Sequence, residues 1–341
     1  MARNQVQKRR LSVESLESRQ LLTGNVALKV IGGNLFMTGD DANNSVTLAG
    51  TATPGKYIVT GLASTKIDGK ASETLTGITA SVIVNLNGGN DTLEITKLKI
   101  GGDLNVNMGS GNNKLDITTA GPVNSLQNSV GGSVVVNSGS GNDVVIETSL
   151  SIGGSNVIST GGGLDKVELG DDPLDKLPGD PKPGKDCFVK TGGDLVVNLG
   201  DGAGSFFDAD GLTLGGSLVA MHGSGKLGTD GIEVENSTMS GVLKITNSGG
   251  GTYSVEGDSA TQLLFIDTGN GNDVFNLVGD SAAAKNSFKV AQILLGGGDD
   301  TLNVKNTTVS TVAVFDGGSG TNHYHDNGGT SLANLQKTNF S

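Results

Sequence analysis

The sequence predicts an all-β fold: a single-chain parallel β-helix (β-solenoid) with rungs of about 22 residues. Glycine makes up 56 of the 341 residues, too many for a helical bundle and too few for collagen, where every third residue is glycine. Short segments of alternating apolar residues recur between paired glycines, and this alternation is typical of a strand with one buried face. Stacked rungs would pair each strand with its neighbours about 4.8 Å away.

Five pairs of glycines mark the repeat. The pairs are Gly101-Gly102, Gly131-Gly132, Gly153-Gly154, Gly192-Gly193 and Gly215-Gly216, which lie 30, 22, 39 and 23 residues apart. A second glycine turn follows each pair at the same spacing, and a further strand segment follows that turn. We expect glycine at these corners because they need a positive φ, and we expect Asn at the turns to form side-chain ladders between rungs.

The chain divides into four parts. They are an N-terminal export or sorting segment (1–24) with a short helix, a degenerate strand-rich cap (25–80), solenoid repeats (81–316) and a C-terminal cap or tail (317–341). The longest repeat unit contains a Pro-rich loop at 170–187, and without that insertion it also has about 22 residues. The repeats should form on the order of ten rungs, a rod of about 50 Å.

Charge is distributed unevenly along the chain. All four arginines lie in the first 19 residues, where five basic residues oppose two glutamates, and the remaining chain carries a net charge of −15. Such a body is poorly suited to phosphate, so we expect no nucleic-acid partner and favour a cation or a cationic partner. Cys187, the single cysteine, excludes an intrachain disulfide. Because no apolar run approaches the length of a membrane span, we expect none.

The N-terminal segment contains the string LESRQLL at residues 16–22. This string resembles the LEPR-XLL N-terminal domain of planctomycete surface and exported proteins. The residues that carry the resemblance are Leu16, Glu17, Arg19, Leu21 and Leu22, whereas Ser18 stands where the family usually has Pro. The resemblance implies that the protein is secreted or lies at the cell surface. The alternative is a plain amphipathic helix that begins near Ser12.

Several turns have the form Gly-x-Gly-x-Asp-x-apolar, as in GSGNDVV at 139–145 and GNGNDVF at 269–275. They resemble the RTX, or hemolysin-type, calcium-binding repeat. That resemblance implies Ca²⁺ as the cofactor, with the metal-ligand candidates Asp91, Asp143, Asp165, Asp273 and Asp300. The family repeats its motif every nine residues, whereas these positions are 22 to 30 apart, so shared ions would require stacked rungs. Stacked carboxylates either recruit Ca²⁺ or have raised pKa values, and turn chemistry alone is the alternative.

These features favour a non-enzymatic extracellular or cell-surface β-solenoid, structural or adhesin-like, with calcium and cell-envelope or matrix components as partners. No catalytic residues stand out. The alternative is a polysaccharide-acting β-helix enzyme, a lyase or glycoside hydrolase, although the body lacks the Arg and Trp with which such enzymes bind sugars. His323 and His325 should share one face of a strand, the spacing of a two-histidine metal site or of a solvated terminal strand.

Overall fold

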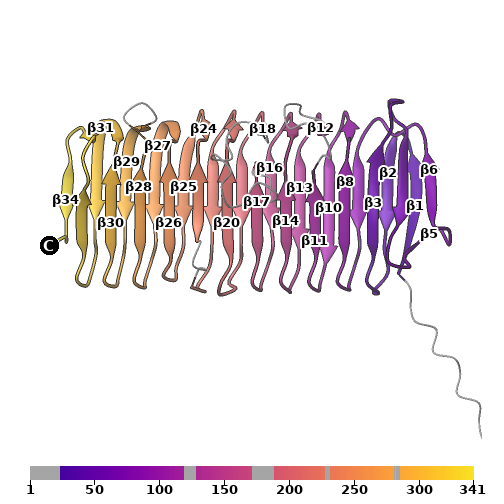
Figure 1. Cartoon of the computed structure of the whole chain (residues 1–341), viewed down its shortest axis with the longest axis horizontal. Helices are drawn as coiled ribbons and strands as arrows, with labels where there is room; N and C mark the ends of the chain where they lie inside the picture. The colour runs from indigo at the N-terminus through magenta and orange to yellow at the C-terminus, as the bar shows by residue number, and fades with distance from the viewer. Residues whose placement is uncertain (1–23, 119–127, 171–187, 227–230, 280, 282–284) are drawn as a thin grey trace, which may run out of the picture.

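The computed structural model describes residues 24–118, 128–170, 188–226, 231–279, 281 and 285–341. Within these ranges the chain contains strands and no helix, and two long, mostly parallel sheets run the length of a rod (Figure 1). The predicted β-solenoid is therefore confirmed. The expected N-terminal helix and the insertion at 171–187 lie outside the described residues.

Each rung contributes three strands. The first strands are β7 (Val82–Asn85), β10 (Leu104–Gly109), β13 (Val134–Ser138), β16 (Asn156–Ser159), β19 (Leu195–Asn198), β22 (Leu218–Met221), β25 (Val242–Thr246) and the later parts of β27 (Ser259–Asp267), β29 (Asn286–Leu294) and β31 (Thr307–Asp316). The second strands form the other sheet: β8 (Thr92–Thr96), β11 (Lys114–Ile117), β14 (Val144–Glu147), β17 (Lys166–Leu169), β20 (Phe206–Asp210), β23 (Ile232–Glu235), β26 (Thr252–Glu256), β28 (Val274–Val278) and β30 (Thr301–Lys305). The short third strands return to the first sheet: β9 (Lys99–Ile100), β12 (Asn128–Val130), β15 (Leu150–Ile152), β18 (Val189–Thr191), β21 (Thr213–Leu214), β24 (Thr238–Met239) and the early parts of β27, β29 and β31.

Register is maintained although rung length varies. Leu104 pairs in parallel with Val82 on one side and with Val134 on the other. Equivalent residues of neighbouring rungs are separated by 22 residues in some pairs and by 39 in another. The strands therefore keep the pairing that satisfies their backbone groups, whatever the number of residues between equivalent positions.

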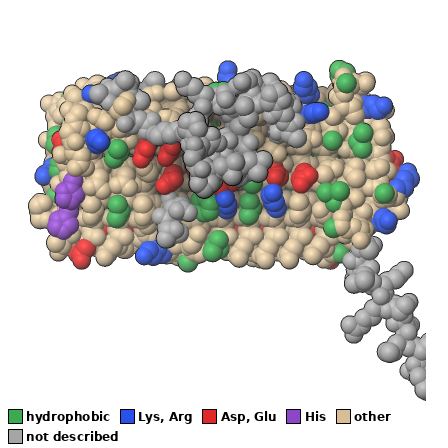
Figure 2. All heavy atoms as spheres, viewed as in Figure 1, with side chains coloured by type: hydrophobic (Ala, Val, Ile, Leu, Met, Phe, Trp, Pro, Cys, Tyr) green, Lys and Arg blue, Asp and Glu red, His purple; other side chains and the backbone are tan. Residues whose placement is uncertain are grey.

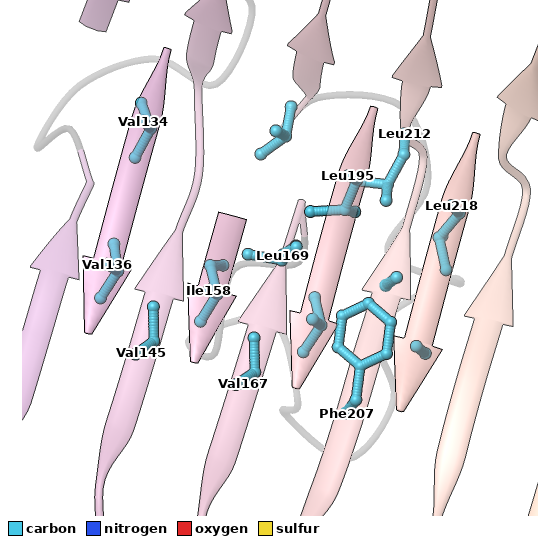
Figure 3. Close-up of a cluster of buried hydrophobic side chains, with 14 of the residues drawn as sticks. Val134, Val136, Val145, Ile158, Val167, Leu169, Leu195, Phe207, Leu212 and Leu218 are labelled. Carbon is cyan, nitrogen blue, oxygen red and sulfur yellow. The ribbon is translucent and has the colours of Figure 1, made fainter. Parts of the chain in front are cut away.

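The core is a narrow column of alternating residues between the two sheets. Val134 and Val136 point inward from β13, and Val145 meets them from β14 (Figure 3). Phe207 of β20, which is fully buried, stacks in register between Val167 and Ile232. Because one rung buries little by itself, each rung depends on the rungs above and below for a continuous core.

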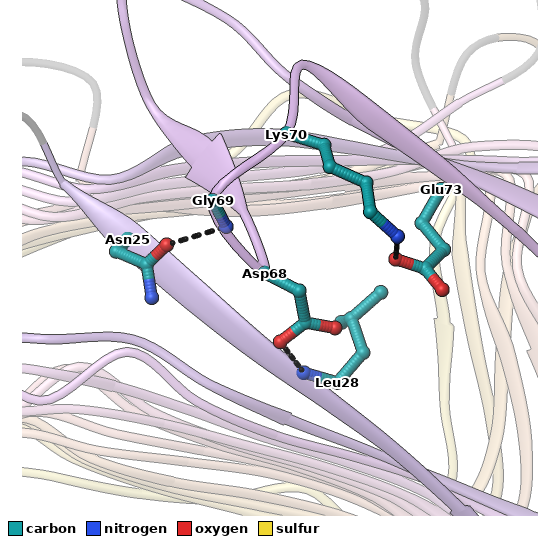
Figure 4. Close-up of polar contacts among 6 residues, drawn as sticks. All are labelled: Asn25, Leu28, Asp68, Gly69, Lys70 and Glu73. Carbon is teal, nitrogen blue, oxygen red and sulfur yellow. Dashed lines mark hydrogen bonds and ion pairs between the residues drawn. The ribbon is translucent and has the colours of Figure 1, made fainter.

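Antiparallel strands cover the N-terminal end of the rod. There β1 (Asn25–Ile31) pairs with β2 (Asn34–Thr38), β3 (Ser45–Gly50) and β6 (Ser72–Leu75) flank β4 (Tyr57–Gly61), and β5 (Lys66–Ile67) runs beside β1. Single polar contacts fasten this cap: Asn25 accepts a bond from the Gly69 N–H, and Asp68 from the Leu28 N–H (Figure 4). At the other end β32 (His323–Asp326) continues the second sheet, and β33 (Ser331–Leu332) and β34 (Gln336–Thr338) continue the first.

Glycine serves two different purposes in the rungs. Gly109 has a φ of +84°, as expected for a turn. The paired glycines of the repeat are not at positive φ, so that expectation is wrong for them. Glycine occupies these positions because there is no space for a side chain. A Cβ on Gly131 would lie 2.5 Å from the carbonyl oxygen of Gly101, and a Cβ on Gly153 would lie 2.2 Å from the carbonyl oxygen of Gly131. Stacked backbones at this corner leave no room for a side chain.

Candidate functional site

The five predicted metal ligands lie in one buried column. The column is formed by the polar residues that immediately precede strands of the second sheet, and we call it the inner Asx column; before β23 and β26 the position is held by Gly231 and Gly251 instead. Its members are Asn44, Asp91, Asn113, Asp143, Asp165, Ser205, Asp273, Asp300 and Asn322. All of them are at most 3% exposed. Stacking thus brings together aspartates that are far apart in the sequence, although Asn113, Ser205, Gly231 and Gly251 interrupt the series.

One oxygen of each aspartate in the column is used to hold the neighbouring rung. Oδ1 of Asp143 accepts a hydrogen bond from the backbone N–H of Asn113 at 2.9 Å, and Oδ1 of Asp165 accepts one from Asp143 at 2.9 Å. The same bond joins Asp273 to Oδ1 of Asp300 at 2.9 Å. These bonds satisfy backbone donors at the turn that the strand ladders cannot reach.

The second carboxylate oxygen of each aspartate, Oδ2, does not take part in these bonds between rungs. Oδ2 of each of the five aspartates is buried and accepts no hydrogen bond of good geometry from the described residues, although hydroxyl groups of Thr160, and of Thr268 and Tyr253, lie near enough to Asp165 and Asp273 to lower their pKa values slightly. At the equivalent position, the side-chain amide of Asn113 donates to the carbonyl oxygens of Gly109 (3.4 Å) and Gly111 (2.9 Å). An aspartate presents an acceptor to such carbonyls where asparagine presents a donor. The contact is favourable only if the carboxyl is protonated or a cation lies between the oxygens.

Burial raises the pKa values of these carboxyl groups. The loss of solvation raises the pKa of Asp91 to about 6 and that of Asp143 to about 6, although backbone N–H donors favour their charged forms. Desolvation raises the pKa of Asp273 to about 7, with a further contribution from the charge of Asp300. The pKa values of Asp165 and Asp300 are raised for the same main reason. Burial is the main cause throughout, and a stacked neighbour adds to it only at Asp143 and Asp273, through the charges of Asp165 and Asp300.

Other side chains occupy the turn where aspartate is missing. His222, which is 5% exposed, bonds through Nε2 to the carbonyl oxygen of Gly202 at 2.7 Å and through Nδ1 to Oδ1 of Asn247 at 3.0 Å. The amide of Asn247 in turn donates to the hydroxyl of Tyr253 at 2.6 Å. His222 is therefore a structural turn residue.

Three buried acids of the described ranges were not predicted from the sequence: Asp258, Glu147 and Glu168, the last of which pairs with Lys166. Asp258, fully buried, accepts the Ser237 N–H at 2.6 Å at the corner between second and third strands, and its own N–H donates to Asn286. A small polar residue recurs there in successive rungs, and that recurrence was the available signal. Glu147 lies inside the core, where Asn156 donates to it at 2.5 Å and burial raises its pKa to about 7. Alignment of the repeats was the available signal, because Glu147 takes the position of the buried Ile117 and Leu169 in the neighbouring rungs.

No three His, Cys, Asp or Glu side chains of the described ranges are grouped so that they could hold a metal ion by themselves. The column places aspartates of adjacent rungs together only as the pairs Asp143–Asp165 and Asp273–Asp300. Any cation there would therefore need carbonyl oxygens of the turns as further ligands. His323 and His325 do share a strand face, with parallel rings 6.3 Å apart.

Comparison with known proteins gives one match. The family described as Planctomycete extracellular matches residues 7–26, which include the LESRQLL string. No curated protein and no solved structure matches the chain. The match supports the predicted planctomycete extracellular signal, and the protein is secreted or lies at the cell surface. In the described part of the chain, no helix has the length and apolar character to cross a bilayer.

Proposed function

We propose that the protein is a non-enzymatic structural rod of the cell surface or extracellular matrix, with an adhesin-like role, and that its inner turns bind Ca²⁺. One observation carries the calcium proposal: five buried aspartates each keep an unpartnered oxygen. In Asn113 the corresponding group is a donor to turn carbonyls. A hard cation bound by oxygen ligands would satisfy both the carboxylates and the carbonyls.

The stacked pairs are the strongest candidates. Asp143 and Asp165 lie in adjacent rungs, and the charge of Asp165 raises the pKa of Asp143. Two carboxylates in low dielectric attract a divalent ion because binding removes their repulsion and their desolvation cost together. Asp273 and Asp300 repeat this arrangement.

The same geometry favours a structural role over catalysis. The aspartates of the column face the interior and accept backbone N–H groups of adjacent rungs. A carboxylate in that position cannot approach a polymer on the outside of the rod. A general acid or base must be within hydrogen-bond reach of its substrate. These acids therefore support the rod rather than a lyase or glycosidase site.

Thermal unfolding with and without calcium tests the proposal. We expect a higher Tm by circular dichroism in CaCl₂ than in EDTA at pH 7.5, and loss of this difference in the double variant Asp143→Asn, Asp165→Asn if that pair binds the ion. Asp194→Asn is the matched control, because Asp194 also accepts a backbone bond, from Ser217, but lies at an exposed corner. Equal melting curves in CaCl₂ and EDTA would remove the calcium proposal. Release of sugar from acidic polysaccharides by the purified protein would contradict the non-enzymatic role.

A further inference from the structure

A basic hollow lies where the cap meets the first rungs. The loop between β3 and β4 projects beside the turn between β8 and β9 and encloses a cavity of about 540 Å³. Its lining includes Thr51, Thr53, Lys56, Tyr57, Lys97 and Lys99, and we call this cavity the lysine hollow. Several basic side chains are visible at this end of the rod (Figure 2).

The backbone of the hollow is held firmly. The Thr51 N–H bonds to the Lys56 carbonyl at 3.0 Å, and the Lys56 N–H bonds to the Thr53 carbonyl at 3.1 Å, which closes the loop on itself. Gly50 packs so closely that a Cβ there would lie 2.0 Å from the carbonyl oxygen of Lys97. The three lysines are therefore carried on ordered backbone, which reduces the entropy lost on binding a ligand.

Tyr57 ties the two walls of the hollow together. Its hydroxyl donates to the carbonyl oxygen of Lys99 at 2.6 Å and accepts from the Lys99 N–H at 3.0 Å. Leu98, between the two lysines of this turn, is fully buried, whereas Lys97 and Lys99 are exposed. The buried leucine anchors the turn and leaves both ammonium groups on the outside.

The hollow has the opposite charge to the rod. Lys56, Lys97 and Lys99 form no ion pair with any described residue, and no acidic residue lines the cavity. The whole chain carries −12. Three uncompensated ammonium groups in such a molecule attract an anion locally and leave the rest of the surface to repel it.

We propose that the lysine hollow binds an acidic polysaccharide through its sulfate or carboxylate groups. The cavity has the volume of a small-ligand site and is open to solvent, as a chain that extends beyond it requires. Separate ammonium groups suit anions spaced along a polymer, whereas bidentate recognition of one phosphate calls for arginine. An extracellular protein meets such polymers in the matrix. The proposal rests on the proposed surface role, for which it names the partner class.

Calorimetric titration of the full chain at low ionic strength tests this. The probes are a galacturonate hexamer, a sulfated galactan hexamer, the uncharged galactan hexamer and inorganic phosphate. We expect binding of at least one acidic hexamer, no binding of the uncharged one, and weakening in added salt. The triple variant Lys56→Gln, Lys97→Gln, Lys99→Gln should bind at least tenfold more weakly. The matched control, Lys66→Gln, Lys190→Gln, Lys305→Gln, removes the same charge from exposed sites elsewhere and should stay within twofold of the unmodified protein.

Three results would overturn the inference: no binding of either acidic hexamer, equal loss in the two triple variants, or inorganic phosphate binding as tightly as the hexamers. Melting curves of both variants show whether the fold is retained. The calcium-dependent melt is a separate measurement on different residues, so the failure of the lysine hollow and the failure of the proposed calcium sites can be told apart.

Discussion

The rungs and the N-terminal cap contain the same types of residue, glycine and small polar residues, but different contacts restrict them in the two regions. In the rungs, Gly109 combines a positive φ with a neighbouring backbone so close that a Cβ would lie 1.3 Å from the carbonyl oxygen of Asn87. In the cap, Gly69 also has a positive φ, +78°, but nothing lies within 4 Å of the position a Cβ would take. The turn alone requires glycine at position 69, whereas both the turn and the stacked backbone require it at position 109.

Polar side chains differ in the same way. In the rungs Asn90, Asn112 and Asn142 form the predicted ladder, in which each side-chain oxygen accepts the backbone N–H one rung further along. In the cap, Asn25 and Asp68 each make a contact that occurs once (Figure 4). Asn112 is therefore constrained by copies of itself in adjacent rungs, whereas Asn25 and Asp68 are constrained only by their own neighbours.

Substitution of Gly109 by alanine should have the largest effect. The new Cβ would overlap the Asn87 carbonyl oxygen, and relief would require rungs to separate, so we expect destabilisation of about 4 kcal/mol or more, or failure to fold. Gly69→Ala should cost only about 1 kcal/mol, the penalty of a left-handed alanine. Urea unfolding followed by circular dichroism measures both. Similar losses in the two variants would show that stacking adds nothing to the demand for glycine.

The contrast also explains how much could be predicted from sequence. The repeated glycine pairs and the alternation around Val134 and Val136 indicate a parallel stack because each copy repeats the same constraint. The shared column of Asp143 and Asp165 follows from the register once stacking is assumed. The burial of these carboxylates and their second, unpartnered oxygens depend on the depth of the turn, which spacing does not encode.

The sequence predicts the cap only as a strand-rich segment, and its antiparallel pairing and the lysine hollow could not be predicted for a physical reason. Lys56 is brought to Lys97 and Lys99 by a loop that occurs once, between antiparallel strands that leave the repeat. Neither periodicity nor a motif relates these residues. Glu147 is an intermediate case: its alignment with Ile117 indicates an inward orientation, whereas its contact with Asn156 is seen only in the structure.

The next largest effect on stability should come from a change of pH, and it should arise from the aspartates of the rungs rather than from the cap. The folded-state pKa values of Asp91, Asp143 and Asp273 are raised to about 6, 6 and 7, above the ordinary value near 4 for an unfolded chain. At a pH between the unfolded-state and folded-state pKa values, the native state binds more protons than the unfolded state. The free energy of unfolding therefore falls as the pH rises from about 4 to about 7. We expect a Tm in EDTA that is several degrees lower at pH 8 than at pH 5.

The double variant Asp143→Asn, Asp165→Asn should reduce that pH dependence, because an amide does not ionise and can donate to the turn carbonyls as Asn113 does. At pH 8 in EDTA it should be more stable than the unmodified protein by about 1 kcal/mol for each site. A variant that is less stable than the unmodified protein under these conditions would mean that the second oxygens are already satisfied.

Removal of the Tyr57 hydroxyl tests the joint between cap and rungs. Tyr57→Phe keeps the buried ring but leaves the Lys99 N–H without its acceptor, so we expect a loss of about 1 kcal/mol. Hydrogen exchange should localise the effect, with faster exchange in the cap strands β4 and β6 than in the rungs. A uniform change along the rod would show that cap and rungs unfold as one unit.

The smallest effect should come from the ion pair on the cap surface. Nζ of Lys70 lies 3.0 Å from Oε2 of Glu73, and the lysine side chain is 64% exposed (Figure 4). Solvent screening and side-chain entropy offset most of the attraction in such a pair, so Lys70→Gln should change the free energy of unfolding by less than about 0.5 kcal/mol. Urea unfolding at low and high salt measures it. A larger, salt-sensitive loss would mean that the cap, which lacks the repeated contacts of the rungs, relies on individual surface contacts for its stability.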